Sequence, residues 1–325
     1  MKIMTLSRVL LGTLCAGGLL LASGAYGQNY PSKPVKVFIP SPPGGGTDTL
    51  ARIVAEKLRE KFGQVFIIEN KPGAGGNIAG EATAKAAPDG YTLMLAHPAP
   101  LVVNKSLYAK ISYEPDAFVP ISLVATVPNV LVVNSKFPAT SVRQLIDAAK
   151  ASPGRLNFAT GVIGAPSSLT PELFKSMTGI NIVGIPYQGS APAIVALLAG
   201  QVDMMFVELS TALPHIRSGK LRALAVAGEQ RSSFLPEVST LAETLPGFIA
   251  TVWFGIVAPP KTPVAIADEL SKAVAEALRQ PDVAKHLADM SLEGVGSTPA
   301  ELAQFMKEES KRWGDVIRKS GAKAD

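Results

Sequence analysis

A glycine triplet is the segment best suited to chemistry, and that chemistry is anion binding. Pro42-Pro43-Gly44-Gly45-Gly46-Thr47-Asp48 lies between the apolar run Val35–Ile39 and a helical pattern over Thr47–Phe62. At such a junction, free backbone N–H groups and the positive helix end converge, and glycine lets a ligand approach the backbone. The alternative is a tight turn in which Thr47 or Asp48 caps the helix. The segment carries neither a Walker Gly-Lys-Ser/Thr nor the G-x-G-x-x-G of a dinucleotide turn.

Three further glycine-containing turns follow along the chain. Asn70–Asn77 again enters a helical pattern, and a purely structural role is at least as good an interpretation there. Thr160–Ser168 and Pro186–Ser190 each follow a strand-like run. Both can present N–H groups, hydroxyls or an aromatic wall to a ligand, so we keep them as candidate binding loops.

Side chains that could catalyse a reaction are few. His97, His215 and His286 are not spaced at i, i+4, and none adjoins a cysteine, so no metal site is indicated. We expect His215 and His286 on helices, at the surface or half-buried. His97 ends a strand, where open α/β folds place ligands, and is a candidate contact. Glu208 is another candidate, although a solvated loop acid is the favoured interpretation. No G-x-S-x-G nucleophile elbow occurs, and we expect no catalytic residue, metal or cofactor.

The elements that must position these loops alternate between short apolar runs and amphipathic helices. In the predicted helix 47–62, Leu50, Val54, Leu58 and Phe62 share one face. This alternation predicts an α/β protein with a parallel sheet and helices on both faces. Strands are expected at 35–39, 65–69, 92–96, 130–133, 156–160, 182–185, 204–207, 223–227 and 252–258. Helices are expected at 47–62, 77–87, 141–151, 169–177 and 191–199.

Capping residues indicate where two further helices begin. Thr262-Pro263 predicts an N-cap followed by proline at the first helical position. Thr298-Pro299-Ala300-Glu301 predicts the same arrangement with a capping box, because Glu301 stands three residues after Thr298.

The N-terminus has the pattern of a secretory signal peptide. Lys2 and Arg8 precede an apolar run over Val9–Leu21, and Ala25-Tyr26-Gly27 supplies small residues at −3 and −1. We therefore expect residues 1–27 to be removed and the protein to reach the periplasm. The single cysteine, Cys15, lies in that run, so the mature chain would have no disulfide and no thiol nucleophile.

Charge argues against a nucleic-acid partner. Without Lys2 and Arg8, 29 of the 31 basic residues remain against 26 acidic ones, which gives a net charge of +3. The basic residues are interspersed with acids, as in Glu56-Lys57-Leu58-Arg59-Glu60-Lys61, and no basic stripe with interleaved aromatics is present.

The ordered loops resemble those of the Bug receptors, the TctC-like extracytoplasmic substrate-binding proteins of tripartite tricarboxylate transporters. Each motif is weak alone, but the ordered set is specific and covers essentially the whole mature chain. The set comprises Tyr30-Pro31-Ser32-Lys33-Pro34, Pro43-Gly44-Gly45-x-x-Asp48-x-x-Ala51-Arg52, Asn70–Asn77, Pro88-Asp89-Gly90-Tyr91-Thr92, Asn104 with Leu107-Tyr108, Pro186-Tyr187-x-Gly189, Trp253-Phe254-Gly255 and Ala258-Pro259.

The resemblance implies a type II periplasmic-binding-protein fold, in which two α/β lobes close on a ligand like a Venus flytrap. The lobes would comprise residues 30–125 plus 249–325, and residues 126–248. The family implies that facing loops hold a ligand carboxylate. Carried over, those loops contain Gly44, Gly45, Gly46, Thr47 and Asp48, then Thr160, Gly164, Ala165, Ser167 and Ser168, and Tyr187, Gly189 and Ser190.

Three departures from the family pattern bear on specificity. Val162-Ile163-Gly164 with Ser168 replaces G-N-G-x-x-x-H, and Gln188 replaces a basic residue. The usual Phe-Asp is Phe206-Val207, with Glu208 one step later and therefore facing the other way on a strand. We therefore expect that the contact of that Asp is lost, leaving a more apolar pocket that prefers a carboxylate without an amino group.

The expected function is capture of a small carboxylate by hinge closure and delivery to the membrane permease subunits of a tripartite transporter, by a protein that we expect to be monomeric. Two alternatives stay open. One is a ligand-loaded sensor component for a signalling kinase, and the other, less favoured, is an enzyme on the same fold.

Overall fold

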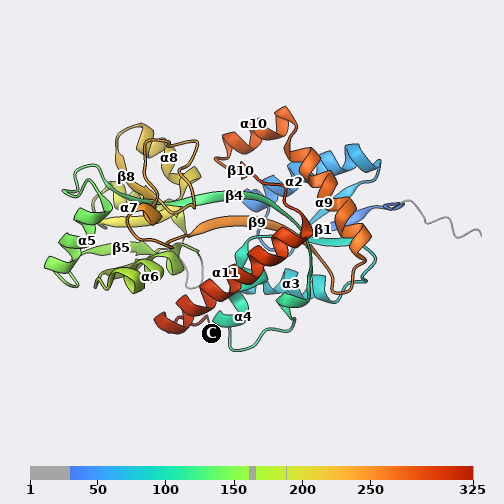
Figure 1. Ribbon diagram of the computed structural model, residues 1–325, viewed down its shortest axis with the longest axis horizontal. Coiled ribbons are helices and arrows are strands. Elements are labelled where there is room, and N and C mark those ends of the chain that lie inside the picture. The colour runs from blue at the N-terminus through green and yellow to red at the C-terminus, as the bar shows by residue number, and fades with distance from the viewer. Residues whose placement is uncertain (1–29, 161–165, 188, 325) are drawn as a thin grey trace, which may run out of the picture. The chain divides into compact units, whose positions relative to one another are not determined.

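The structure is a computed structural model that describes residues 30–160, 166–187 and 189–324. The side chains of residues 166 and 167 lie outside this description. From Lys33 onward the chain forms one compact unit, which is described here by itself. Within it, two groups of helices and strands, the first and second lobes, are joined by the long strands β4 and β9 (Figure 1).

The first lobe is built on three parallel strands. β1 (Val35–Ile39) lies between β2 (Phe66–Asn70) and β3 (Thr92–Ala96). Helix α2 (Gly46–Phe62) buries Leu50, Val54 and Leu58, the face that the i+4 spacing predicts. Its end is set by Gly63, which takes the left-handed conformation with φ 67° and donates its N–H to Arg59 O.

The second lobe repeats this plan. β5 (Asn157–Thr160) pairs in parallel with β6 (Val183–Pro186) and β7 (Met204–Glu208). Its helices are α5 (Val142–Ala151), α6 (Pro166–Thr178), α7 (Ser190–Leu198) and α8 (Leu209–Arg217). The rings of Phe174, Phe206 and Phe248 pack together in its core, with centroids 5.5–6.1 Å apart.

The lobes share strands, and here the prediction of a parallel sheet is wrong, because the shared strands run antiparallel to their neighbours. β4 (Val119–Asn134) pairs antiparallel with β9 (Thr251–Ala258) along its first part, and with β7 and β8 (Leu221–Val226) along its last. The sheet order is β2-β1-β3-β9-β4-β7-β5-β6. Sequence alternation could not reveal this, because β4 is buried along almost its whole length and shows no polar face.

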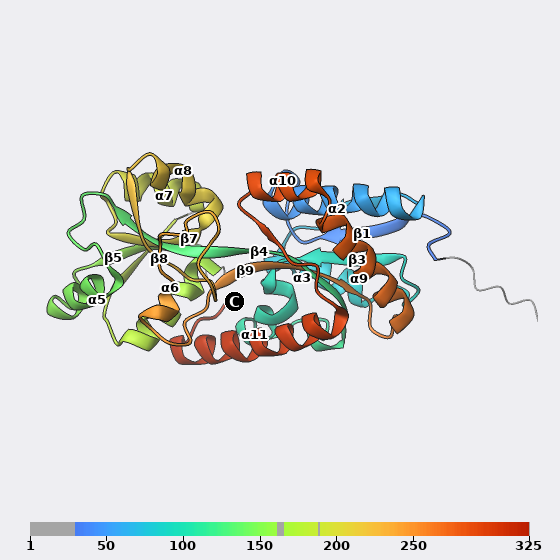
Figure 2. The same ribbon diagram turned by 45° about the horizontal axis from the view of Figure 1, so that its top comes forward.

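The last part of the chain returns to the first lobe with α9 (Val264–Leu278), α10 (Pro281–Asp289), β10 (Glu293–Gly294) and α11 (Pro299–Ser320). The capping box of Thr298 and Glu301 is confirmed. The predicted cap by Thr262 is wrong, because its hydroxyl donates to Pro259 O at 2.8 Å and Pro263 holds the N-cap position. Helix α11 packs against β4 and against α6 of the second lobe (Figures 1 and 2).

Short helices complete the first lobe around its loops. They are η1 (Ala74–Gly76), α3 (Asn77–Ala84), the π-helical turn η2 (Ala99–Val103), α4 (Asn104–Leu107) and η3 (Pro115–Ala117), while η4 (Leu241–Glu243) follows β8. Helix α3 ends three residues before the predicted Ala87. None of the helices in the described ranges combines the length and apolarity that crossing a bilayer demands.

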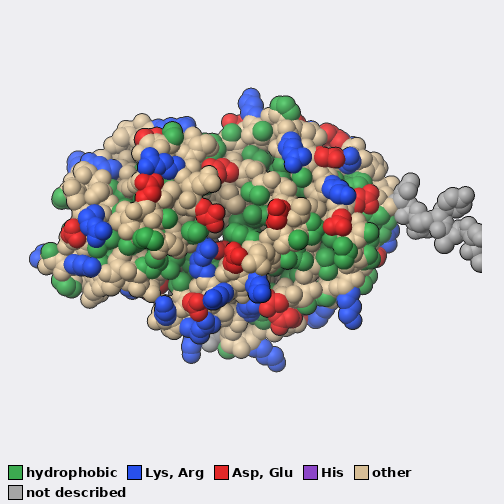
Figure 3. All heavy atoms as spheres, in the orientation of Figure 1, with side chains coloured by type: hydrophobic (Ala, Val, Ile, Leu, Met, Phe, Trp, Pro, Cys, Tyr) green, Lys and Arg blue, Asp and Glu red, His purple; other side chains and the backbone are tan. Residues whose placement is uncertain are grey.

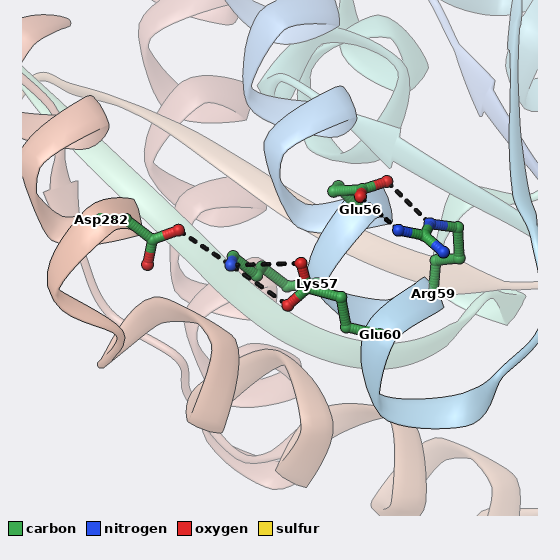
Figure 4. A network of polar contacts seen from close by, with 5 residues as sticks. All are labelled: Glu56, Lys57, Arg59, Glu60 and Asp282. Carbon is green, nitrogen blue, oxygen red and sulfur yellow. Dashed lines mark hydrogen bonds and ion pairs between the residues drawn. The ribbon is translucent and has the colours of Figure 1, made fainter.

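A surface network of charges ties α2 to α10 (Figure 4). Lys57 of α2 forms ion pairs with Asp282 of α10 at 2.8 Å and with Glu60 at 3.2 Å. In the same turn of α2, Arg59 pairs with Glu56 at 2.6 Å. These pairs lower the pKa of the Asp282 carboxyl and raise that of Lys57. The network links the solvent-facing sides of the two helices, and none of its residues lines the ligand cavity.

Candidate ligand-binding site

A cavity of about 590 Å³ lies at the ends of the β-strands of the first lobe and reaches the second lobe. Its volume suits a small-molecule ligand. The loop after β1, the turn after β2 and the segment after β3 line it from the first lobe, Val252 and Phe254 of β9 form an apolar wall, and Glu208 belongs to β7. Residues from both lobes therefore meet in one cavity.

The glycine triplet contributes its helical end to this cavity. Gly46 and Thr47 line it, and both belong to the first turn of α2. The first N–H groups of a helix have no intrahelical acceptor and lie at its positive end. The first of the helical hydrogen bonds is Thr49 N–H to Gly45 O, at 2.9 Å. The N–H groups of Gly46 and Thr47 are thus placed to solvate an anion.

Asp48 lies outside the lining of the cavity. The residue is 3% exposed beneath the loop, and its carboxylate accepts hydrogen bonds from Gly44 N–H at 2.9 Å and from Asn70 Nδ2 at 3.0 Å. Arg52 binds both carboxylate oxygens at 3.0 Å, and this hydrogen bonding is the main reason why the pKa of Asp48 falls to about 2. Asp48 shapes the loop, and the N–H of Gly44 is engaged in doing so. A ligand contact by Gly44, Gly45 or Asp48 remains a prediction.

The second glycine turn also lines the cavity, through Gly73, Gly75 and Gly76. Asn104 Nδ2 donates to Gly75 O at 3.0 Å and fixes the turn. A Cβ on Gly75 would stand 2.8 Å from the hydroxyl of Tyr108, another lining residue. The sequence indicated a structural role for this turn, and the structure adds that it forms a wall of the cavity.

His97 is half-buried and lines the cavity at the end of β3. Its Nδ1 accepts the N–H of Ala99 at 3.3 Å. Burial lowers its pKa to about 4, so the ring is neutral at pH 7 and its proton resides on Nε2. His97 thus offers the cavity a hydrogen-bond donor without a positive charge.

The position of Glu208 differs from the one that the sequence predicts. It is the last residue of β7, lines the cavity and is half-buried, so the favoured interpretation as a solvated loop acid is wrong. Burial raises the pKa of its carboxyl. A carboxyl therefore still reaches the cavity from this strand end. The expected loss of the family's Asp contact, and the preference for a ligand without an amino group, stay predictions.

Ser41 was missed by the sequence analysis. Its Oγ is buried with no hydrogen-bond partner among the described residues, and the residue lines the cavity. A buried hydroxyl without a partner is costly unless a ligand or water satisfies it. The available signal was its place just past a β-strand in an open α/β sheet.

The remaining predicted residues lie at the same sheet edge as Glu208, outside the lining that the structure describes. Thr160 ends β5 and Ser168 stands in the first turn of α6. Tyr187, Gly189 and Ser190 join β6 to α7. Ser167 belongs to α6, with its side chain outside the description, and Gly164 and Ala165 lie outside the described residues. His215 and His286 are on α8 and α10, half-buried and exposed, as predicted.

A second cavity of about 330 Å³ lies on the opposite face of β9, since Thr251 lines it whereas Val252 and Phe254 line the first. Its walls include Glu309 and Arg312, which are already paired at 2.6 Å. In the face shown in Figure 3, basic and acidic side chains are interspersed, without an extended patch of either sign. Glu309 and Arg312 of the second cavity thus satisfy each other, and the cavity at the strand ends is the better ligand site.

Comparison with known proteins agrees with this geometry. The model of the tripartite tricarboxylate transporter family receptor matches residues 50–322. The chain belongs to this receptor family. BugT of Bordetella pertussis is 42% identical over 306 residues, which cover 93% of this receptor and 94% of BugT. The resemblance seen in the sequence is thereby confirmed.

Two solved structures of similar proteins show which fold the receptor has. A protein of R. palustris solved with adipate is 35% identical and superposes with a TM-score of 0.76, covering 90% of this receptor and 99% of that chain. MatC of Rhodopseudomonas palustris, solved with malate, is 35% identical with a TM-score of 0.73, covering 89% and 100%. The receptor has the two-lobed α/β fold of periplasmic binding proteins, and the predicted fold class is confirmed.

Proposed function

We propose that this receptor is a periplasmic solute-binding protein that captures a small dicarboxylate between its lobes and delivers it to the membrane subunits of a tripartite transporter. The observation that carries the proposal is the cavity in which the first turn of α2 and Glu208 of β7 meet. Relatives of the same fold bind adipate and malate, which are both dicarboxylates. The role is binding and release, without chemical conversion of the ligand.

Main-chain N–H groups hold one carboxylate at the α2 end of the cavity, and the hydroxyl of Ser41 and the Nε2–H of His97 add donors there. One lost N–H contact costs about 1–3 kcal/mol of binding free energy. Val252 and Phe254 cover the apolar part of the ligand. The binding loops are completed from the second lobe by Thr160, Ser168, Tyr187, Gly189 and Ser190.

Closure is a hinge motion about β4 and β9, the two strands common to both lobes. Ligand contacts made only in the closed form drive it, since a ligand with equal affinity for both forms shifts nothing. The closed form is what the membrane subunits recognise. Residues 1–27 are removed on export, which mass spectrometry of the secreted protein tests directly.

Calorimetric titration of the purified receptor tests the proposal with adipate, malate, succinate, aspartate and glutamate, and with glucose as an uncharged control. We expect a dicarboxylate to bind in the micromolar range or tighter and glucose not to bind. Uptake of the bound compound by membrane vesicles that contain the transporter subunits then tests delivery. Chemical conversion of any of these compounds by the purified receptor would overturn the non-enzymatic role.

A further inference from the structure

The cavity contains an acid but no cation in its described lining. Glu208 is the acidic residue there, and no lysine or arginine of the described residues lines it. The other titratable lining residues are His97 and Tyr108, and burial keeps the imidazole neutral at pH 7. Residues 161–165 and 188, which adjoin the second-lobe loops, are Gly-Val-Ile-Gly-Ala and Gln, none of them ionisable.

The elements packed around Glu208 do not balance its charge either. In the antiparallel ladder with β4, the residue opposite Glu208 is Asn129, an amide. The wall from β9 is Val252 and Phe254. A dicarboxylate in this cavity would thus bring a second carboxylate toward Glu208 with no fixed positive charge between them. Two carboxylates that share such a site hold one proton between them, because both cannot remain ionised at low cost.

We propose that Glu208 binds the second carboxylate of a dicarboxylic ligand as a neutral acid, so that ligand capture takes up one proton from solvent. The inference rests on the proposed function and adds a specificity-determining role for Glu208. The O–H of the protonated carboxyl donates to an oxygen of the ligand carboxylate, and no covalent bond of the ligand breaks. The first carboxylate stays ionised at the N-terminus of α2.

Two observations favour this arrangement over an ionised Glu208. Burial already raises the pKa of the free carboxyl, so protonation demands less free energy than at an exposed glutamate. The first lobe places the N–H groups of Gly46 and Thr47 and the orphan hydroxyl of Ser41 at the α2 end of the cavity. Among the described lining residues, Glu208 is the one polar side chain from the second lobe, which places it to meet the far end of a linear diacid.

The test is calorimetry of the full receptor with adipate, malate and succinate in two buffers of different ionisation enthalpy, from which the number of protons taken up is obtained. Above the pKa of Glu208, we expect uptake to approach one proton per ligand and the affinity to fall about tenfold per pH unit. Glu208→Gln, whose amide imitates the protonated acid, should bind with little pH dependence and no uptake. The exposed control Glu229→Gln should behave like the unmodified receptor.

The outcomes separate the two proposals. Dicarboxylate binding without proton uptake, or uptake that Glu208→Gln leaves unchanged, overturns the role of Glu208 while capture of dicarboxylates stands. Aspartate binding that exceeds succinate binding and is lost in Glu208→Gln also overturns it, because Glu208 would then be ionised and paired with the ammonium. If no dicarboxylate binds, the proposed function fails. The role of Glu208 as a neutral acid toward a dicarboxylate then fails with it.

Discussion

The indole Nε1 of Trp253 donates a hydrogen bond of 2.9 Å to Oε2 of Glu309, and this contact joins the shared strand β9 to helix α11. The same oxygen accepts from Trp313 Nε1 at 3.0 Å, while Oε1 accepts from Arg312 Nη1 at 2.6 Å. Glu309 is 2% exposed. One buried carboxylate thus satisfies two indoles and a guanidinium beside the strands that join the lobes.

Removal of this carboxylate should destabilise the receptor strongly. Glu309→Ala leaves two indole N–H groups and the guanidinium without their acceptor, and we expect a loss of about 3–5 kcal/mol in the free energy of unfolding. Glu309→Gln keeps one carbonyl acceptor and should lose less. Urea denaturation followed by tryptophan fluorescence measures both variants, and equal stability of Glu309→Ala and the unmodified receptor would contradict this account.

The ion pair between the buried Asp48 and the exposed Arg52 should make the receptor sensitive to acid. A folded-state pKa of about 2, below the ordinary 3.8, gives a contribution of about 2 kcal/mol, fully present above pH 4 and lost as the pH falls toward 2. Asp48→Asn should lose this stability at pH 7 and flatten the pH dependence in that window. Denaturation curves between pH 2 and pH 7 check both effects, and a variant that keeps the acid dependence would assign it to other groups.

The second glycine turn should tolerate no side chain at Gly75. Its φ of 62° strains any L-residue, and the added Cβ would stand 2.8 Å from the Tyr108 hydroxyl. We expect Gly75→Ala to lose about 2 kcal/mol, of which the left-handed backbone accounts for about 1. In the background Tyr108→Phe, which lacks that hydroxyl, the loss should shrink. A double-mutant cycle measures the coupling, and strictly additive effects would argue against the contact.

A substitution at Gly46 should weaken ligand binding without lowering the stability of the receptor. A Cβ there meets nothing within 4 Å, and the position belongs to a helix, so Gly46→Leu should keep or slightly raise the free energy of unfolding. Its side chain would occupy space beside the cavity and weaken dicarboxylate binding by about tenfold or more, which is about 1.4 kcal/mol. The matched control is Gly46→Ala, whose methyl group reaches less far than the leucine side chain and should weaken binding less. Unchanged affinity in Gly46→Leu would remove the triplet from the site.

Local signals allowed much of the fold to be predicted. The i+4 stripe of α2, the strand β1 and the capping box before α11 each depend on a few neighbouring residues, so their bounds agree closely with the structure. The cap predicted at Thr262 failed because Pro259 O, three residues earlier, offered its hydroxyl a better partner than the helix did. The antiparallel pairing of β4 was not predicted, because the pairing of a strand depends on other strands that lie far away in the sequence.

The amino-acid sequence by itself determined the family, the alternating α/β elements and the glycine turn at the N-terminus of α2, since composition, periodicity and motif order are properties of short stretches. Only the tertiary structure decided which of the candidate residues share a cavity. It placed Asp48 beneath the loop, brought Ser41 and the turn at Gly75 into the wall, and set Glu208 across from the N-terminus of α2. The reason is physical: burial and the partners of a side chain depend on residues far away in the chain, and β4 and β9 bring those residues together.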